Sequence, residues 1–302
     1  FNNTGGTVNV ANGTLVMNVG GTDTGTYDIA SGTTLDMNTS RTLNSGASFT
    51  NTGTLQFGGG TITFGALHTF ASAGPSVVLN GSTLTSANPL TMQGPLNWLA
   101  GTITGGSTLN TSGTTTIGAG MNLSNKTWNN SGTVNVGNNH VKTDTSTINN
   151  TNIFNLTGTG TFNRSGGGVS TINNSGTFNK TSAGSLSINA GFNTDFNNTG
   201  GTVNVANGTL VMNTTFTQDG TIDIASGTTF STNSQNLTNS ATGVIRGSGT
   251  VNLSGATLTN NGIVAPGAAS GDTTGTLSIT GNYTQGAGGA LNVELGGTAA
   301  GD

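Results

Sequence analysis

Hydrophobic and polar residues alternate with a period of two along most of this chain. Val8 and Val10 flank Asn9, and Ile62 and Phe64 flank Thr63. This alternation predicts short β-strands with one buried face and one face toward solvent. Helices are not expected, because no long window has apolar positions at helical spacing and because glycine and asparagine recur too densely for a helix to propagate.

The apolar members of these strands are expected to form one continuous core. The two tryptophans, Trp98 and Trp128, follow the same pattern and are interpreted as core residues. The strands with the clearest alternation place the following side chains inward: Val8, Val10, Ile29, Leu55, Phe57, Ile62, Phe64, Val134, Val136, Ile172, Phe178, Val203, Val205, Ile222, Ile224, Leu277 and Ile279.

A short motif, in which an apolar residue precedes two asparagines, recurs in the middle of the chain. Its copies begin at Thr127, Thr147, Thr171 and Asp195, at spacings of 20, 24 and 24 residues. A repeat of this length that contains only short strands and turns is typical of a β-solenoid, since one coil cannot bury its own apolar face. The sequence therefore predicts an all-β fold, a single continuous solenoid over residues 1–302, with about 14 coils of roughly 20–25 residues each.

A longer repeat contains the shorter one. Phe1–Asn18 returns letter for letter as Phe196–Asn213, 195 residues further along the chain. Such repetition points away from catalysis, because an active site is a single constellation whereas a repeat supplies length and surface. Because the first residue already lies inside a repeat unit, we expect the chain to be a fragment of a longer polypeptide.

Two sets of polar residues recur at the coil period and are candidates for ordered ladders. The first asparagine of the motif is expected to bond through its amide to its equivalents in neighbouring coils; these residues are Asn129, Asn149, Asn173 and Asn197. Threonines on three consecutive coils are expected to form an outward array; they are Thr61, Thr63, Thr83, Thr85, Thr102 and Thr104.

Composition narrows the possible partners. Only 5% of the residues are charged, 52 are glycine, and the net charge is −4. The six basic residues are scattered, so no basic stripe for nucleic acid is expected. No apolar run approaches the roughly 20 residues of a membrane span. The chain has no cysteine, which excludes disulfides and thiolate metal sites.

No cofactor, metal site or enzymatic activity is expected. His68 and His140 are isolated from other ligand residues and are interpreted as solvent-facing or coil-edge residues. The ten acidic residues form no cluster outside the repeat. Asp28 and Asp223 are equivalent in the two long copies, which favours outward solubilising charges over a catalytic pair.

The segment 262–302 carries a more specific pattern. It contains Gly262-Ile263-Val264-Ala265-Pro266-Gly267, then Gly275-Thr276-Leu277-Ser278-Ile279-Thr280-Gly281-Asn282-Tyr283-Thr284-Gln285, and then Gly289-Ala290-Leu291-Asn292-Val293-Glu294-Leu295-Gly296-Gly297. This block resembles the repeat of bacterial autotransporter passenger domains, and the upstream coils resemble filamentous-haemagglutinin-like exoproteins. The resemblance implies a right-handed parallel β-helix, export to the cell surface, and adhesive or scaffolding work.

These observations favour the shaft of a large secreted bacterial surface protein. Its partners would be components of host, neighbouring-cell or matrix surfaces, and its location extracellular. The alternative is a subunit of an extracellular filament or sheath, in which solenoids stack end to end. A third hypothesis is an ice-binding solenoid that uses the threonine array to order water.

Overall fold

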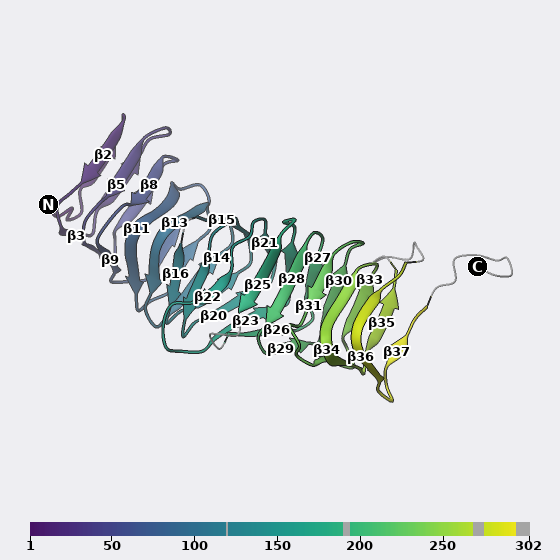
Figure 1. Cartoon of the computed structure of the whole chain (residues 1–302). Coiled ribbons are helices and arrows are strands. Elements are labelled where there is room, and N and C mark those ends of the chain that lie inside the picture. Colours follow the sequence, from purple (N-terminus) through teal and green to yellow (C-terminus); the bar gives the residue numbers. More distant parts are fainter. Residues whose placement is uncertain (119, 190–193, 268–274, 294–302) are drawn as a thin grey trace. The chain divides into compact units, whose positions relative to one another are not determined.

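The protein is described here by a computed structural model, which covers residues 1–118, 120–189, 194–267 and 275–293. All regular structure in these ranges is β-strand, as the alternation predicts (Figure 1). The strands are parallel and stack as a β-solenoid of about 13 turns, against about 14 expected. None of the described residues belongs to a helix that is long and apolar enough to cross a membrane.

The chain divides into two compact units. The first comprises Phe1–Ile148 and Arg164–Gly168, and the second comprises Asn149–Asn163 and Val169–Asp302. Within the first unit lie β1 (Thr7–Val10), β2 (Thr14–Met17), β3 (Gly21–Asp23), β4 (Thr26–Ile29), β5 (Thr34–Met37), β6 (Arg41–Leu43), β7 (Ser48–Thr50), β8 (Thr54–Phe57), β9 (Thr61–Phe64), β10 (His68–Phe70), β11 (Ser76–Ser86), β12 (Leu90–Met92), β13 (Leu96–Thr104), β14 (Thr108–Thr111), β15 (Thr114–Ile117), β16 (Met121–Ser124), β17 (Thr127–Asn130), β18 (Thr133–Val136) and β19 (Val141–Asp144).

The second unit has the same kind of strands. They are β21 (Ile153–Leu156), β23 (Ser170–Asn174), β24 (Thr177–Lys180), β25 (Ser185–Asn189), β26 (Thr194–Asn198), β27 (Thr202–Val205), β28 (Thr209–Asn213), β29 (Phe216–Gln218), β30 (Thr221–Ile224), β31 (Thr229–Ser231), β32 (Leu237–Asn239), β33 (Val244–Gly247), β34 (Thr250–Asn260), β35 (Ile263–Pro266), β36 (Ser278–Gln285) and β37 (Ala290–Leu291). Two further strands, β20 (Thr147–Asn150) and β22 (Phe162–Arg164), contain residues of both units.

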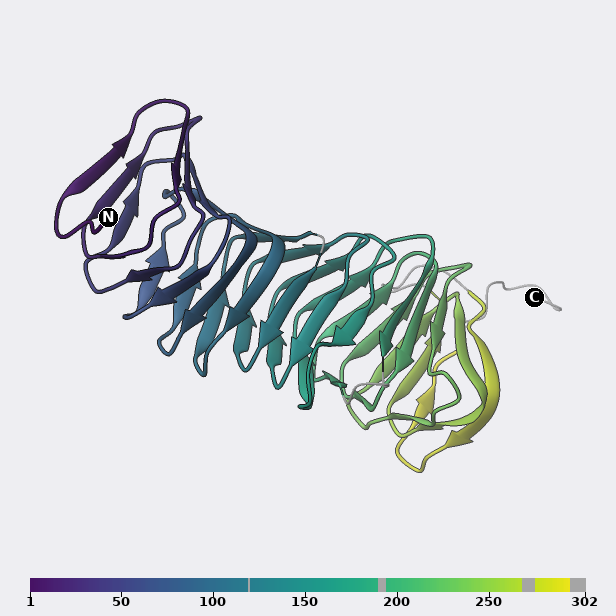
Figure 2. The same cartoon turned by 60° about the vertical axis from the view of Figure 1, so that its left-hand side comes forward.

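Strands pair in parallel with the strand one turn further along the chain. At the start of the first unit, β1 pairs with β4, β2 with β5, and β3 with β6. In the second unit β24, β27, β30 and β33 follow one another in the same way (Figure 2). The backbone groups of one turn are therefore satisfied by the turns before and after it, which allows a chain rich in asparagine and glycine to remain in strands.

Inward side chains stack in register and form the core of each unit. In the first unit Leu35, Leu55 and Val77 are consecutive partners, and all three are buried. In the second unit the ring of Phe178 lies 5.2 Å from that of Phe154 and 5.0 Å from that of Phe196, measured between centroids. Stacked apolar residues remove water from the whole length of each unit, and this burial is the main favourable term in its stability.

Most of the predicted core positions are buried, and both tryptophans belong to this core. Three of the predicted positions, Val8, Leu277 and Ile279, are only half-buried. Among the described residues, β1, which carries Val8, pairs with β4 alone, and β36, which carries Ile279, pairs with β34 alone. Val8 and Ile279 therefore have a described turn on one side only, which leaves their other side uncovered, although Val10 on the same strand as Val8 is buried. Of the block 262–302, residues 268–274 and 294–302 lie outside the described residues.

Candidate functional site

The threonine array lies on β9, β11 and β13 of the first unit. Thr83 pairs with Thr61 on one side and with Thr102 on the other. Thr85 pairs with Thr63 and with Thr104 in the same way. The structure thus brings the six threonines into two parallel ranks, above the fully buried side chains of Ile62, Leu84 and Ile103. Neighbouring strands lie about 4.8 Å apart and alternate residues along a strand about 6.7 Å apart, so the array is a regular lattice of hydroxyl and methyl groups.

One rank continues beyond the array. Thr42 pairs with Thr63 and Thr22 pairs with Thr42, while Ser124 follows Thr104 on the opposite side. The other rank passes from Thr102 to Asn122, whose amide donates to the Thr102 hydroxyl at 3.4 Å. The hydroxyl lattice therefore has its full width over three turns only.

The four predicted ladder asparagines fall into both units. In the first unit, Asn129 Nδ2 donates to Asn110 Oδ1 at 2.9 Å. In the second unit, Asn173 Nδ2 donates to Asn149 Oδ1 at 2.8 Å and Asn197 Nδ2 donates to Asn173 Oδ1 at 2.9 Å. Each amide is half-buried on the outer face. Bonds of this kind join turns without any apolar contact.

A second amide ladder, which the sequence reasoning missed, lies inside the second unit. Asn150 Nδ2 donates to Asn174 Oδ1 at 2.8 Å, Asn174 to Asn198 at 2.9 Å, and Asn198 to Gln218 Oε1 at 3.0 Å. All four amides are buried. The alternation of the sequence could have predicted this ladder, because the second asparagine of each Asn-Asn pair lies two residues after an inward apolar residue and therefore also points inward.

The buried amides also bind the backbone of the turns. Asn174 donates to the Thr202 carbonyl and Asn198 donates to the Thr221 carbonyl. Each buried amide therefore replaces the water that a turn carbonyl would otherwise require. A similar pair, Asn239 and Asn260, follows at 2.8 Å, but Gln218 donates instead to the carbonyls of Gly220 and Val244.

Two lysines are buried with carbonyl partners. Lys126 Nζ donates to the Ser86 carbonyl at 3.1 Å and to the Gly105 carbonyl at 3.5 Å, and loss of hydration lowers its pKa to about 8. Lys180 Nζ, in the second unit, donates to the carbonyls of Ser182, Gly184 and Asn207, and burial lowers its pKa. Because backbone carbonyls accept hydrogen bonds from both ammonium groups, these lysines stabilise the turns that carry the carbonyls.

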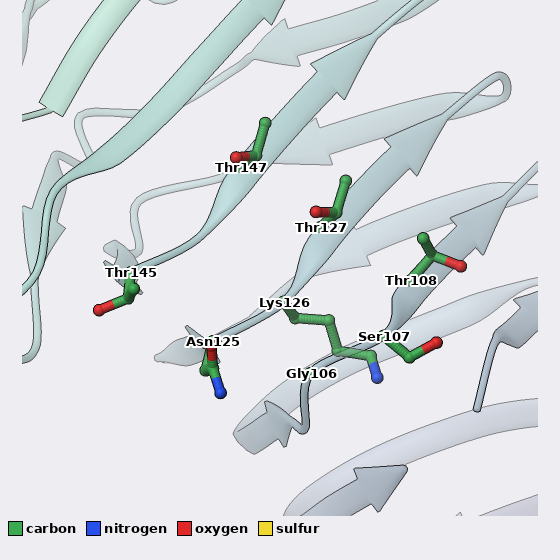
Figure 3. Close-up of a pocket in the computed structure, with 8 residues that line it drawn as sticks. All are labelled: Gly106, Ser107, Thr108, Asn125, Lys126, Thr127, Thr145 and Thr147. Atoms are coloured by element: carbon green, nitrogen blue, oxygen red, sulfur yellow. The ribbon is translucent and has the colours of Figure 1, made fainter. Parts of the chain in front are cut away.

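Lys126 also lines a polar pocket of about 190 Å³ in the first unit (Figure 3). The other lining residues are Gly106, Ser107, Thr108, Asn125, Thr127, Thr145 and Thr147. Gly105 next to it has φ +104°, and a Cβ there would lie 2.2 Å from the Ser86 carbonyl oxygen, so the corner requires glycine. The ammonium points to carbonyls, and the pocket offers uncharged hydroxyl and amide groups to solvent.

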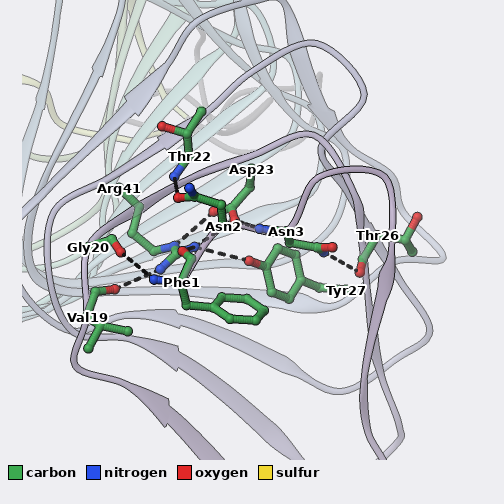
Figure 4. A network of polar contacts seen from close by, with 10 residues as sticks. All are labelled: Phe1, Asn2, Asn3, Val19, Gly20, Thr22, Asp23, Thr26, Tyr27 and Arg41. Carbon is green, nitrogen blue, oxygen red and sulfur yellow. Dashed lines mark hydrogen bonds and ion pairs between the residues drawn. The ribbon is translucent and has the colours of Figure 1, made fainter.

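A buried ion pair lies in the first turns (Figure 4). Arg41 Nη2 lies 2.6 Å from Asp23 Oδ1, and both side chains are inaccessible to solvent. Burial lowers the pKa of Arg41, but the hydrogen bond to Asp23 and the negative charge of Asp23 outweigh it, so that the pKa is raised overall. Burial and the neighbouring Asp23 raise the pKa of Tyr27. The guanidinium also donates to the carbonyls of Val19 and Phe1, which ties the first turns together.

The expectation that His68 faces solvent or lies at a coil edge is wrong. Its ring is buried against the rings of Phe49, Phe64 and Phe70, and Phe70 is the nearest at 4.7 Å between centroids. Burial lowers the pKa of His68 to about 4, so the ring is neutral near pH 7. No sequence pattern indicated this burial, because a single histidine at an inward position cannot be told from an isolated exposed one.

The acidic residues remain dispersed in the part of the chain that the structure describes. Asp28 accepts a hydrogen bond from the Thr50 hydroxyl at 3.0 Å, and Asp223 pairs with Arg246 at 3.1 Å. No group of three or more His, Cys, Asp or Glu side chains capable of holding a metal ion occurs among the described residues. Asp272, Glu294 and Asp302 lie outside them.

In comparisons of the chain with protein families, curated proteins and solved structures, no family model, no curated protein and no solved structure matches it.

Proposed function

We propose that this protein is the shaft of a secreted bacterial surface protein, which acts in adhesion through length and repeated surface. The observation that carries the proposal is the in-register stacking of turns in each unit, in which the same contacts recur from turn to turn. The letter-for-letter repeat of Phe1–Asn18 supports it as well, because duplication adds turns without creating a unique site.

Deletion of whole turns tests this proposal. Removing 174–197 joins Asn173 to Asn198 and keeps the register, because Asn173 pairs with Asn197 and Asn174 with Asn198. Removing 114–132 from the first unit is the matched deletion, because Thr114 pairs with Thr133. Each variant should stay folded by circular dichroism and should be shorter by one turn in electron micrographs.

The functional readout is binding of the purified chain to cells and to matrix components. A shaft predicts a modest decline of similar size for both deletions. Complete loss of binding by one folded variant, with full retention by the other, would place a unique site in the deleted turn and refute the shaft. Continuous fibres in the micrographs of the full chain would instead favour the filament alternative.

The threonine array favours a second candidate, an ice-binding surface. The lattice is uncharged and regular in both directions over three turns, which suits a surface that orders water. Thr83→Lys changes its centre, and Thr171→Lys on β23 changes a half-buried outward threonine elsewhere. Thermal hysteresis that is lost in the first variant and kept in the second supports ice binding, and absence of hysteresis in the unmodified chain excludes it.

A further inference from the structure

The polar pocket of the first unit is open space among the described residues. It has a volume of about 190 Å³ and takes its lining residues from three consecutive turns (Figure 3). A Cβ on Gly106, one of these residues, would meet no atom within 4 Å, so the protein itself does not fill the space there. Sites for drug-sized ligands begin at roughly 300 Å³. This pocket is smaller, and it suits a ligand of a single ring.

Four lining side chains offer polar groups that have no partner among the described residues. Ser107, Thr127 and Thr147 contribute hydroxyls, and Asn125 contributes an amide. Asn125 is exposed, and the three hydroxyl residues are half-buried. The hydroxyls of Thr127 and Thr147 point to the same side (Figure 3). Because a hydroxyl both donates and accepts and an amide does the same through two atoms, these groups can bind a ligand that also presents donors and acceptors.

The corner beside the pocket carries backbone strain. Gly105, Asn125 and Thr145 occupy the same corner in consecutive turns, as the pairing of the strands before them shows. All three have positive φ, and for Asn125 and Thr145 φ is +49°. Glycine adopts this conformation freely, but a β-branched residue does so at a cost. Thr145 is the only β-branched residue with positive φ among the described residues, and residues held in this way cluster at binding sites.

The charges near the pocket are already paired with the protein. The Lys126 ammonium donates to two carbonyls, and the Asp144 carboxylate accepts from the Gly168 nitrogen and the Thr145 hydroxyl. This pairing disfavours a charged ligand. No lining residue has an aromatic or aliphatic side chain, which disfavours an apolar one. The remaining groups are neutral donors and acceptors on three turns, and a sugar ring carries neutral hydroxyls of the same kind.

We propose that this pocket binds one neutral monosaccharide unit of a glycan. The amide of Asn125 and the hydroxyls of Ser107, Thr127 and Thr147 bond to hydroxyls of the sugar ring. Without an aromatic side chain to stack on the ring, the contact is weak, with a dissociation constant on the order of 10 mM. The sequence did not predict this site, because its residues are serine, threonine and asparagine, which occur throughout the chain.

For its biological role this inference rests on the proposed function, since glycans are components of cell and matrix surfaces. A contact of this strength adds to the binding by a repeated surface and does not replace it. Removal of one turn should therefore still cause only a modest decline in cell binding.

The test is a titration of the full chain with sugars, followed by the backbone amide signals in nuclear magnetic resonance spectra. The probes are the methyl glycosides of glucose, galactose, mannose and N-acetylglucosamine, each up to about 100 mM, or ten times the expected dissociation constant. At least one of them should shift the signals of Asn125 and Thr145 in a saturable way. Glycerol at the same concentration should not, because its hydroxyls are not held on a ring.

Asn125→Gly removes a ligand group without a risk to the fold, because glycine suits the positive φ at this position. It should weaken sugar binding at least about fivefold and should not lower the melting temperature. Asn51→Gly is the matched control, because Asn51 is an exposed asparagine of the first unit with φ +70° that does not line the pocket. Gly106→Leu fills the open space from a residue without positive φ and should abolish the shifts.

Three results would overturn the proposal: no saturable shift with any of the four sugars, equal shifts with glycerol, or equal binding by Asn125→Gly and Asn51→Gly. These results are independent of the test of the shaft. A chain that binds cells but none of the sugars keeps the proposed function and loses this site. A chain that binds a sugar but no cells keeps the site and loses the proposed function.

Discussion

The two copies of the 18-residue repeat have the same sequence and different degrees of burial. Phe196 is fully buried in the second unit, whereas Phe1 is 59% exposed in the first. Leu210 is fully buried, and its counterpart Leu15 is 38% exposed. The strands nevertheless begin at equivalent residues, Thr7 and Thr202. Local sequence therefore determines the strand and its inward phase, and burial depends on the neighbouring turns.

The pairing of these strands explains the difference. In the second unit β27 pairs with β24 on one side and with β30 on the other. In the first unit, within the part of the chain that the structure describes, β1 pairs with β4 alone. Each turn buries apolar surface against the turns on either side, so Leu15 and Val8, which have one described neighbouring turn, are only partly covered, although Val10 on the same strand as Val8 is buried.

The polar contacts that follow each copy also differ. Asn198 donates to Gln218 and to the Thr221 carbonyl. Asn3 donates to the equivalent carbonyl of Thr26, but the residue equivalent to Gln218 is Asp23, which accepts from the Asn3 backbone nitrogen. A carboxylate in this position requires a buried cation, and Arg41 supplies it. One copy is thus joined to the next turn by neutral amides and the other by an ion pair.

The largest expected effect contrasts the two phenylalanines. Phe196→Ala removes a buried ring that lies 5.0 Å from Phe178 and 5.6 Å from Phe216, and it should cost about 3–5 kcal/mol of unfolding free energy. Phe1→Ala should cost less than about 1 kcal/mol, since its ring is mostly exposed. Denaturant unfolding monitored by circular dichroism measures both free energies. Equal losses of unfolding free energy would show that the two phenylalanine rings are buried to the same extent.

The second effect concerns the ion pair. Asp23→Asn leaves Arg41 charged and buried without its counter-ion, which should cost about 3–5 kcal/mol. Gln218→Asn shortens a neutral amide at the equivalent position and should cost about 1–3 kcal/mol. The double variant Asp23→Leu with Arg41→Leu is the control, because removing both charges should restore most of the loss. If Asp23→Asn and Gln218→Asn are equally mild, the ion pair is not the main link.

Acid should distinguish the two units. Both histidines of the chain lie in the first unit, and the pKa of the buried His68 is lowered from 6.5 to about 4. The unfolded state then binds the proton more readily, so stability is complete above about pH 6.5 and falls as the pH drops toward 4. The loss should reach about 3 kcal/mol.

Unfolding measured between pH 7 and pH 4 checks this effect, with His68→Phe as the control. The unfolding free energy of this variant should not change with pH in this window, because the phenylalanine ring would pack without a titrating group. If the unfolding free energy of His68→Phe still falls between pH 7 and pH 4, groups other than His68 cause the sensitivity to acid.

Much of the fold was predictable from sequence, because alternation and the coil period are local signals that stacking amplifies. Ile172, Phe178 and Val203 are inward as expected. Val8 and Ile279 were predicted as inward core residues and are only half-buried, since the alternation of the sequence carries no information on how many turns cover a residue. The strand pattern therefore predicts which side chains point inward better than it predicts how deeply they are buried.

The polar interior was less predictable. The outward asparagines were recognised from their recurrence, but Asn174 and Asn198 also recur and were not recognised as buried, because an inward amide is favourable only when its partner lies one turn away. Arg41 and Lys126 posed the same difficulty. Asp23 lies 18 residues from Arg41, and the Ser86 carbonyl lies 40 residues from Lys126, so no local sequence pattern predicts either pairing.

The smallest expected effect concerns the buried asparagines of the two copies. Asn198→Ala leaves the amide of Asn174 on one side without its acceptor and the Thr221 carbonyl on the other side without its donor. Unpaired buried groups cost about 1–3 kcal/mol, so a loss near 2 kcal/mol is expected. Asn3→Ala should cost about 1 kcal/mol, because Asn3 side-chain contacts reach only the following turn through the Thr26 carbonyl.

Asn197→Ala is the matched control for this prediction. Asn197 is the neighbouring residue on the same strand, and its half-buried amide bonds outward to Asn173. Water can replace that bond, so the substitution should cost less than about 1 kcal/mol. Denaturant unfolding of the three variants gives the order Asn198, Asn3, Asn197. If Asn197→Ala lowered the unfolding free energy most, the outer amide ladder would be the main polar link between turns, and the buried amides would add little to the stability that the apolar core supplies.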